Sequence, residues 1–424
     1  MSQEKTTALH TRQQTPVFIV LHDAAFRVLW GVGGLSEVAR WMEQLVLSLL
    51  IWHLTHAPLP LALVLVFNNL PRPLCAPLAG WLADRCPRRQ ILVGAQILST
   101  GTALAVLGLL MAERLQPWQI FLAVALQGVV KALEDPARRT AILDLVGAER
   151  LVNAMSLDVV TNTLGKMLGP LIGGVMIEHI GFPAAYAWVL ALHILTLGLT
   201  TRVQIPPVQR DRTAGDPLWQ GLVMAVRYAR QHAMLMGLLY VTLVMNALAF
   251  PARQFIPAIG SDLLGVGAGL VGLLAAAESV GQLVSAGLIA CTQRLQYHGR
   301  LFLGGSFLVL LTGMLFVWSP WYALAFALLA LGGCGQAGFS TMQSTITMLA
   351  TPPAMRGRMM GLVSVCIGVS TPLGTLAMGL MATTYTIPYA IALSALGGLI
   401  LLLPAALLTP LLWQRLMSPA LRSA

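Results

Sequence analysis

Residues 80–90 read GWLADRCPRRQ, a segment with one acid and three arginines at the junction of two apolar stretches, 58–82 and 90–112. A diverged copy, GLIACTQRLQ, occurs at residues 287–296, also at the junction of two apolar stretches. A segment that recurs in this way indicates an internal repeat. We therefore expect a chain of two related halves, with the two copies at equivalent places.

The composition of the 424-residue chain points to a bilayer as its solvent. The chain is 57% hydrophobic and only 10% charged, whereas soluble domains are about 45–50% apolar and about 25% charged. A soluble protein of this size could not cover so much apolar surface. The lipid bilayer is therefore the first predicted partner.

Several kinds of chemistry are not indicated. The net charge of +10 is spread over short connectors rather than gathered on a basic helix, so no nucleic-acid partner is expected. The five cysteines are scattered without a C-x-x-C pair, which predicts neither a metal site nor a disulfide framework. The motifs G-x-x-x-x-G-K-[ST], H-E-x-x-H and G-x-S-x-G are absent, so we expect neither an enzyme nor a cofactor.

Twelve stretches are long enough to span a membrane, which takes ~20 mostly apolar residues. They lie near 28–52, 58–82, 90–112, 118–137, 154–178, 184–201, 233–259, 267–292, 301–318, 321–349, 358–383 and 387–412. Two connectors are longer than the others, residues 138–153 and 202–232, and the second divides the spans six and six. The first stretch is too long for a signal peptide and is predicted to be retained.

The predicted organisation follows from this division. It comprises an N-terminal segment 1–27, a first bundle 28–201, a linker 202–232, a second bundle 233–412 and a tail 413–424. The fold class is an all-α membrane protein with twelve transmembrane helices in two pseudo-symmetric six-helix bundles. Parallel repeats of this kind are a transporter architecture, with the substrate site near the midplane between the halves.

The basic residues set the orientation. If the N-terminus is inside, the inner segments carry 20 of the 26 lysines and arginines, the outer loops carry only Arg114, and five lie within spans. Because lysine and arginine concentrate in cytoplasmic loops, both termini are predicted to be cytoplasmic.

Two motifs carry a family resemblance. Residues 80–89 resemble the G-x-L-A-D-R-x-G-R-R loop of the major facilitator superfamily, with Pro87 at the second glycine. GKMLGPLIGG at 165–174 resembles the exporter signature G-x-x-x-G-P-x-x-G-G on the fifth span. The phrases FRVLW (26–30), PARRTAILDLV (136–146) and MRGRMMGL (355–362) resemble the branch that includes the enterobactin exporter and macrolide efflux pumps.

The resemblance implies a function. It implies a secondary transporter that exports a small molecule, siderophore-like, another anionic metabolite or an antibiotic, by alternating access and proton antiport. The expected location is the bacterial inner membrane, and a monomer is expected. Two alternatives remain open, a transporter of lysophospholipids or other amphiphiles and a membrane sensor that has a transporter fold but transports nothing.

The first motif is a candidate conformational latch on the inner face. Its residues are Gly80, Asp84, Arg85, Arg88 and Arg89. A carboxylate there can pair with arginines and with the N-terminus of a neighbouring helix, and so hold one state of a two-state transporter. The alternative is that these charges only set the topology.

The second motif is predicted to allow close helix packing. Its residues are Gly165, Gly169, Pro170, Gly173 and Gly174. Small residues at this spacing let another backbone approach closely, and proline permits a bend. The resemblance implies that this bend closes the cavity.

The stretch SEVARWMEQ (36–44) places charges within the first span. Each costs about 2.5–3.5 kcal/mol on insertion scales, so such groups are functional candidates. At about 100° per residue, Glu37, Arg40 and Glu43 fall within an arc of about 120°, which should face the cavity. Either one glutamate exchanges protons while Arg40 holds the other ionised, or the three form a fixed structural set.

Other charged groups within spans are also candidates. They are Glu278, Lys166, Arg253 and Arg72. Within the spans, basic residues outnumber the clearly mid-span acids, so the cavity is expected to suit anionic or zwitterionic cargo. Trp30 and Trp52 are expected to be anchors at the membrane interface, whereas Trp41 is placed to stack against cargo.

Overall fold

The computed structural model describes residues 17–75, 79, 82, 86–203, 218–291 and 297–413. All regular secondary structure in these residues is helical, which confirms the all-α class. The elements are η1 (Val17–His22), α2 (Ala24–Thr55), α3 (Pro58–Asn69), α5 (Arg88–Met111), α6 (Pro117–Thr200), α7 (Leu218–Arg230), α8 (Ala233–Val244), η2 (Met245–Ala249), η3 (Phe250–Phe255), α9 (Ile256–Ala258), η4 (Ile259–Leu263), α10 (Ala268–Cys291), α11 (His298–Phe316), α12 (Tyr322–Leu349), η5 (Pro353–Met355), α13 (Arg356–Thr384), α14 (Ile387–Leu408) and η6 (Pro410–Leu412).

Eight helical segments of the described chain are long and apolar enough to cross a membrane. They include the whole of α5 and the continuous stretch Ala233–Leu263, which joins α8 to η4. The chain is therefore a multi-pass membrane protein. Neither α2, which carries charges at its centre, nor the short α3 is among the eight, so the count of twelve stays a prediction.

Helix α6 joins three of the predicted spans. Its backbone departs from helical angles at Gly147 (φ 74°) and Gly181 (φ 81°), a left-handed region that glycine enters without strain. Residues 138–153, which the sequence suggested were a connector, are thus helical except at Gly147. Polar side chains there suggested a loop, but they lie on a helix beyond the apolar spans. The predicted linker 202–232 likewise contains a helix, α7, which packs on α8 and α13.

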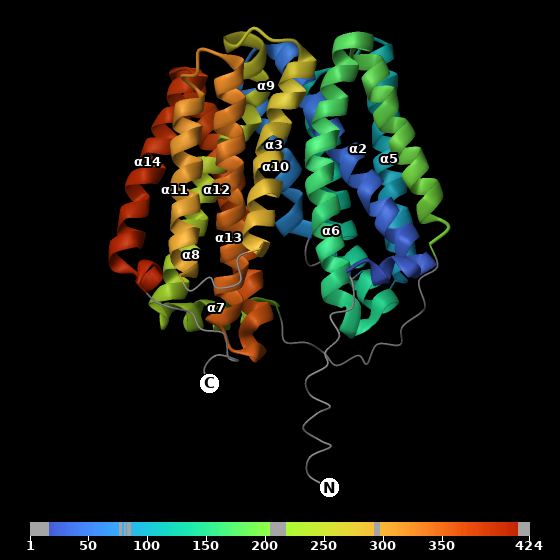
Figure 1. Cartoon of the computed structure of the whole chain (residues 1–424). Helices are drawn as coiled ribbons and strands as arrows, with labels where there is room; N and C mark the ends of the chain where they lie inside the picture. The colour runs from blue at the N-terminus through green and yellow to red at the C-terminus, as the bar shows by residue number, and fades with distance from the viewer. Residues whose placement is uncertain are drawn as a thin grey trace.

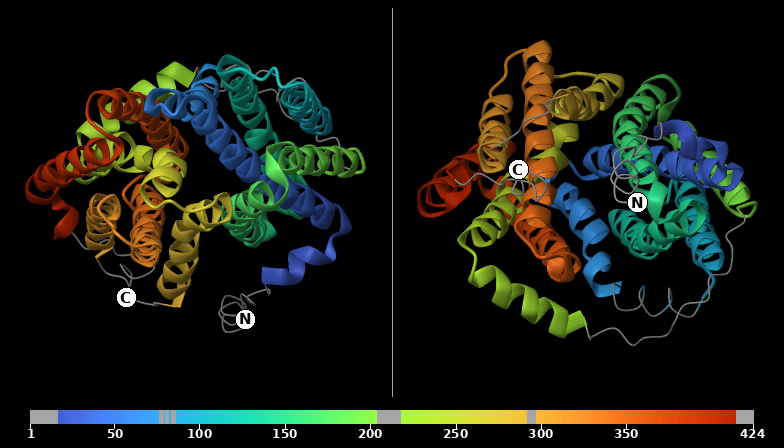
Figure 2. Two further views of the ribbon diagram at one scale, coloured as in Figure 1. Left: turned by 90° about the horizontal axis from the view of Figure 1, so that it is seen from above. Right: turned by 60° about the horizontal axis from the view of Figure 1, so that its bottom comes forward.

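The helices form two groups (Figure 1). In the first group, α2 and α5 pack extensively on α6; in the second, α11 packs on α12 and α14. The groups meet chiefly through two helix pairs, α3 with α13 and α6 with α10, and also where α3 contacts η3 and α2 contacts α9. Figure 2 shows the same arrangement from above and from below. The described helices nearest the two chain ends, η1 and η6, lie at the same end of the molecule as α7.

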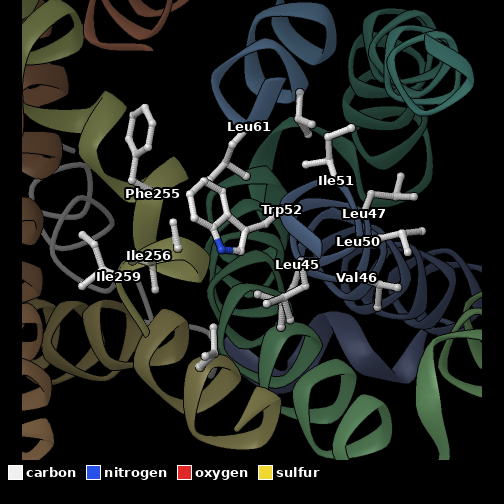
Figure 3. Close-up of a cluster of buried hydrophobic side chains, with 14 of the residues drawn as sticks. Leu45, Val46, Leu47, Leu50, Ile51, Trp52, Leu61, Phe255, Ile256 and Ile259 are labelled. Atoms are coloured by element: carbon white, nitrogen blue, oxygen red, sulfur yellow. The ribbon is translucent and has the colours of Figure 1, made fainter. Parts of the chain in front are cut away.

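Apolar side chains join the two groups at the end of the molecule remote from α7. There, Trp52 and Leu61 of the first group belong to the same buried cluster as Phe255, Ile256 and Ile259 of the second, and Figure 3 shows Trp52 among them. The other two buried clusters each lie within one group. The molecule is therefore closed at the remote end.

Hydrogen bonds between the groups reinforce this closure. Trp52 Nε1 donates to Asp262 Oδ1 at 3.0 Å, so Trp52 is buried and is not the interface anchor that its position suggested. Gln254 Nε2 donates to the carbonyl oxygen of Leu61 at 2.9 Å. The backbone N–H of Gly269, at the start of α10, donates to a carboxylate oxygen of Glu178 at 2.7 Å.

Candidate functional site

A cavity of about 560 Å³ lies between the two helix groups. Helices α2, α3 and α6 supply one wall, and η3, α10, α12 and α13 supply the other. Five basic side chains line it but only two acidic ones. They are Arg40, Arg72, Lys131, Lys166 and Arg253, with Glu37 and Glu278. The structure thus brings together all the span charges named as cavity candidates except Glu43.

Glu37 is the shared anion of the first wall. Its side chain is 4% exposed and forms ion pairs with Arg40, one turn along α2, and with Lys131 on α6. Lys131 Nζ lies 3.3 Å from Glu37 Oε1 and 3.2 Å from Asp135 Oδ1. One buried carboxylate therefore ties two cations from two helices to the edge of the cavity.

The second wall holds a simpler pair. Arg253 forms an ion pair with Glu278, donates to Gln336 Oε1 at 3.1 Å and lies over the ring of Phe250. Its side chain is 34% exposed, so water screens this pair more than the pairs of Glu37.

Two cavity cations have no carboxylate partner within the described residues. Lys166 Nζ lies 5.2 Å from the ring centre of Trp41, a cation–π arrangement, and Arg72 follows the end of α3. Nearby, three buried N–H donors lack an acceptor in the described chain, namely Trp41 Nε1, Gln44 Nε2 and Arg72 Nε. Buried donors are normally satisfied, so this wall is chemically complementary to a ligand rich in hydrogen-bond acceptors and negative charge.

Glu43 does not line this cavity, contrary to the prediction from its helical position. It is 2% exposed and lies inside the first group, where Tyr186 Oη donates to its Oε1 at 2.6 Å and His193 Nε2 lies 3.3 Å from its Oε2. Of Glu37 and Glu43, Arg40 pairs with Glu37 in the described structure. The arc of about 120° that holds Glu37, Arg40 and Glu43 therefore faces both the cavity and the interior of the first helix group, because α2 has neighbours on several sides.

The proposed latch is described only in part. Gly80, Asp84 and Arg85 lie outside the described residues. Arg88 forms an ion pair with Asp144 on α6, and an Nη of Arg89 donates to the carbonyl oxygen of Thr201. Both arginines therefore bind groups at the end of the molecule where α7 lies. The role of the loop as a latch stays a prediction.

The glycines of the second motif lie against two different helices. A Cβ at Gly165 would lie 2.6 Å from Glu37 Cβ, and one at Gly169 would lie 2.7 Å from the backbone nitrogen of Met42, both on α2. A Cβ at Gly173 would also approach Met42. Gly174 instead faces α10, across the interface between the groups, and Pro170 lines the cavity.

Substitution of Gly174 tests this packing. A Cβ there would lie 2.3 Å from the carbonyl oxygen of Ala268, a backbone atom that cannot rotate away. Gly174→Val is expected to lower the free energy of unfolding by about 1–3 kcal/mol because α6 and α10 must separate. Unfolding of the purified protein, followed by tryptophan fluorescence, measures this loss. The control is Gly198→Val on the same helix, where a Cβ meets nothing within 4 Å; equal losses would contradict the prediction.

Several polar residues of the first group were missed as candidates. Gln96, Ser99, Tyr186 and His193 are all buried within α5 and α6. The available signal was the presence of Gln96 and His193 inside otherwise apolar spans, where polar groups are costly.

Membrane-length helices around a central cavity that carries charged side chains, with the cavity between two helix groups, define the class of membrane transporters. Residues 15–416 match the family model of the major facilitator superfamily described as "transmembrane secretion effector". The chain belongs to this family, as its motifs indicated, and it is a transporter and not an enzyme.

Curated relatives of the chain include an exporter and a putative multidrug resistance protein. The enterobactin exporter EntS of Salmonella choleraesuis is 26% identical over 397 residues, covering 89% of this chain and 92% of the relative. The putative multidrug resistance protein MdtD of Escherichia coli O6:H1 is 30% identical over 179 residues, 42% of this chain. That match spans 36% of the length of MdtD.

Solved structures share the fold. A bacterial homologue of the human lysosomal transporter Spinster, described as inward-facing and unoccupied, superposes with a TM-score of 0.70 at 14% identity. The match covers 93% of this chain and 98% of that one. The nucleoside transporter NupG, as a D323A mutant, gives a TM-score of 0.72 at 13% identity, covering 90% of this chain and 99% of NupG.

Proposed function

We propose that the protein exports an anionic small molecule by alternating access, with protons moving in the opposite direction. The observation that carries the proposal is the charge of the cavity, which five basic and two acidic side chains line. Cargo that carries carboxylate, phosphate or catecholate oxygens would complement Lys166 and Arg72. A permanent cation would instead meet an excess of positive charge.

The proposed topology follows the distribution of basic residues. Twelve spans form two six-helix bundles, residues 28–201 and 233–412, and the termini lie in the cytoplasm. With this orientation, the end closed by Trp52 and its neighbours faces outward. The described conformation is then the one that receives cargo from the cytoplasm, as an exporter requires.

The cellular setting follows from the relatives. Exporters such as EntS, to which the chain is similar over most of its length, support a location in a bacterial inner membrane. A siderophore-like molecule is the cargo class that agrees best both with the similarity to EntS and with the excess of basic side chains in the cavity. The proposed working unit is a monomer.

Transport by purified protein in liposomes tests the proposal. We expect an imposed pH gradient to drive enterobactin, used as the anionic probe, and to drive ethidium at most one-tenth as fast. The pH-sensitive dye pyranine, enclosed in the vesicles, should report that protons move in the direction opposite to the anionic cargo. Faster transport of ethidium than of enterobactin would instead indicate a transporter of cationic drugs. Movement of labelled lysophospholipid without a pH gradient would indicate a lipid transporter. The absence of transport of every probe would favour a sensor.

A further inference from the structure

A second polar region lies within the first helix group. It surrounds a cavity of about 10 Å³, a size that holds about one water molecule. Polar side chains from α2, α5 and α6 line nearly all of it, and Val130 is the one apolar residue among them. They are Ser36, Arg40, Gln96, Ser99, Gln127, Lys131, Glu134 and His193.

His193 connects this small cavity to Glu43. Its Nε2 lies 3.3 Å from Glu43 Oε2, and its Nδ1 is buried and has no partner in the described chain. Both side chains are nearly inaccessible, at 3% and 2% exposure. His193 is the only charged or titratable partner of Glu43 in the described chain apart from Tyr186, whose hydroxyl donates to Oε1.

The small cavity adjoins the large one. Arg40 and Lys131 line both cavities, and both form ion pairs with Glu37. Glu134, which also lines the small cavity, accepts a hydrogen bond from Gln96 Nε2 at 3.4 Å. A change of charge or position at Glu37 can therefore affect the small cavity through Arg40 and Lys131. Glu43 itself does not line the large cavity.

We propose that Glu43 and His193 form a proton-binding site that is separate from the cargo cavity, with His193 as the relay. A hydronium ion reaching the small cavity gives a proton to Nδ1 and leaves water behind, while the proton on Nε2 transfers to Glu43 Oε2. The O–H bond of hydronium and the Nε2–H bond break, and an Nδ1–H bond and an Oε2–H bond form. The imidazole therefore stays neutral and the carboxylate becomes a carboxylic acid. The reverse steps release the proton.

This assignment predicts how coupling works, and in this respect it rests on the proposed function. Cargo and proton would not compete for one carboxylate, because the cargo meets Lys166 and Arg72 while the proton meets Glu43. Communication would pass through Glu37 and its two cations. Tyr186, which is fixed by its bond to Glu43, would hold the carboxylate in position.

Infrared difference spectroscopy of the full chain in lipid tests the proton site without any cargo. Acidification should produce the C=O stretching band of a protonated carboxyl group in the wild type. Glu43→Gln should remove this band, whereas Glu278→Gln should retain it. If Glu43→Gln does not yield folded protein, Glu43→Asp should shift the band. A band unchanged in the Glu43 variants would overturn the assignment.

The relay has its own test. His193→Gln keeps a side-chain nitrogen near Glu43 but has no second nitrogen facing the small cavity. After a rapid pH jump, the carboxyl band should therefore appear about 10²-fold more slowly, the lower range for losing a positioned acid–base group. An unchanged rate would overturn the role of His193. Because neither measurement uses cargo, failure of the transport proposal would leave both results interpretable.

Discussion

Replacing Glu37 with glutamine is expected to destabilise the protein by about 3–5 kcal/mol, since it leaves the buried Arg40 without its counter-charge and takes from Lys131 one of its two carboxylate partners. The carboxylate is 4% exposed and holds both Arg40 and Lys131. Unfolding of the purified variant in SDS, followed by tryptophan fluorescence, measures the loss. Enterobactin transport should also fall, because the first wall of the cavity loses its organising charge.

The control for Glu37→Gln is the same change at Glu278. That glutamate pairs with Arg253, which is 34% exposed, so its loss should cost no more than about 1 kcal/mol. A double variant, Glu37→Gln with Lys131→Met, should recover part of the lost stability because it removes the cation that has lost its buried partner and retains only the more exposed Asp135. Equal destabilisation by the two single variants would show that burial of the Glu37 pairs is not decisive.

Replacing Lys166 with methionine is expected to weaken anionic cargo binding by about 10- to 100-fold. A hydrogen bond to a charged group contributes about 1.5–3 kcal/mol, and each 1.4 kcal/mol is about tenfold in affinity. Lys166 is suited to this role because its described neighbour is the ring of Trp41 rather than a carboxylate. The apparent KM for enterobactin in proteoliposomes measures the change.

Two variants bracket the Lys166 result. Lys166→Arg keeps the positive charge and should restore most of the affinity. Arg114→Gln removes an exposed charge on a connector remote from the cavity and should change the KM less than twofold. If Lys166→Met transports the anionic probe with an unchanged KM, the cargo does not bind this side chain.

The fold was largely predictable because its causes are local and repetitive. Apolar length, the positions of arginines and the recurrence of one loop pattern all follow from how a helix meets a bilayer. The helical connector at 138–153 was not predictable in this way. Outside the membrane, a polar helix and a polar loop have similar compositions, and packing decides between them.

The site was predictable as a set of charges but not as a set of contacts. Glu37 and Glu43 share one side of α2, yet one meets Lys131 and the other meets His193. A helical wheel shows which residues lie on the same side, but it does not show which neighbouring helix they meet. His193 was missed for the same reason, because its importance comes from a partner 150 positions away in sequence.

The contact between α6 and α10 has a consequence for how the remote end can open. Gly174 and Gly272 bring main chain against main chain, since a Cβ on Gly272 would lie 2.3 Å from the carbonyl oxygen of Pro170. Side-chain closures can loosen by rotamer changes, but two backbones in contact have no rotamers to change. The contact at this point therefore cannot loosen by side-chain rotation, and opening requires one whole helix to move away from the other.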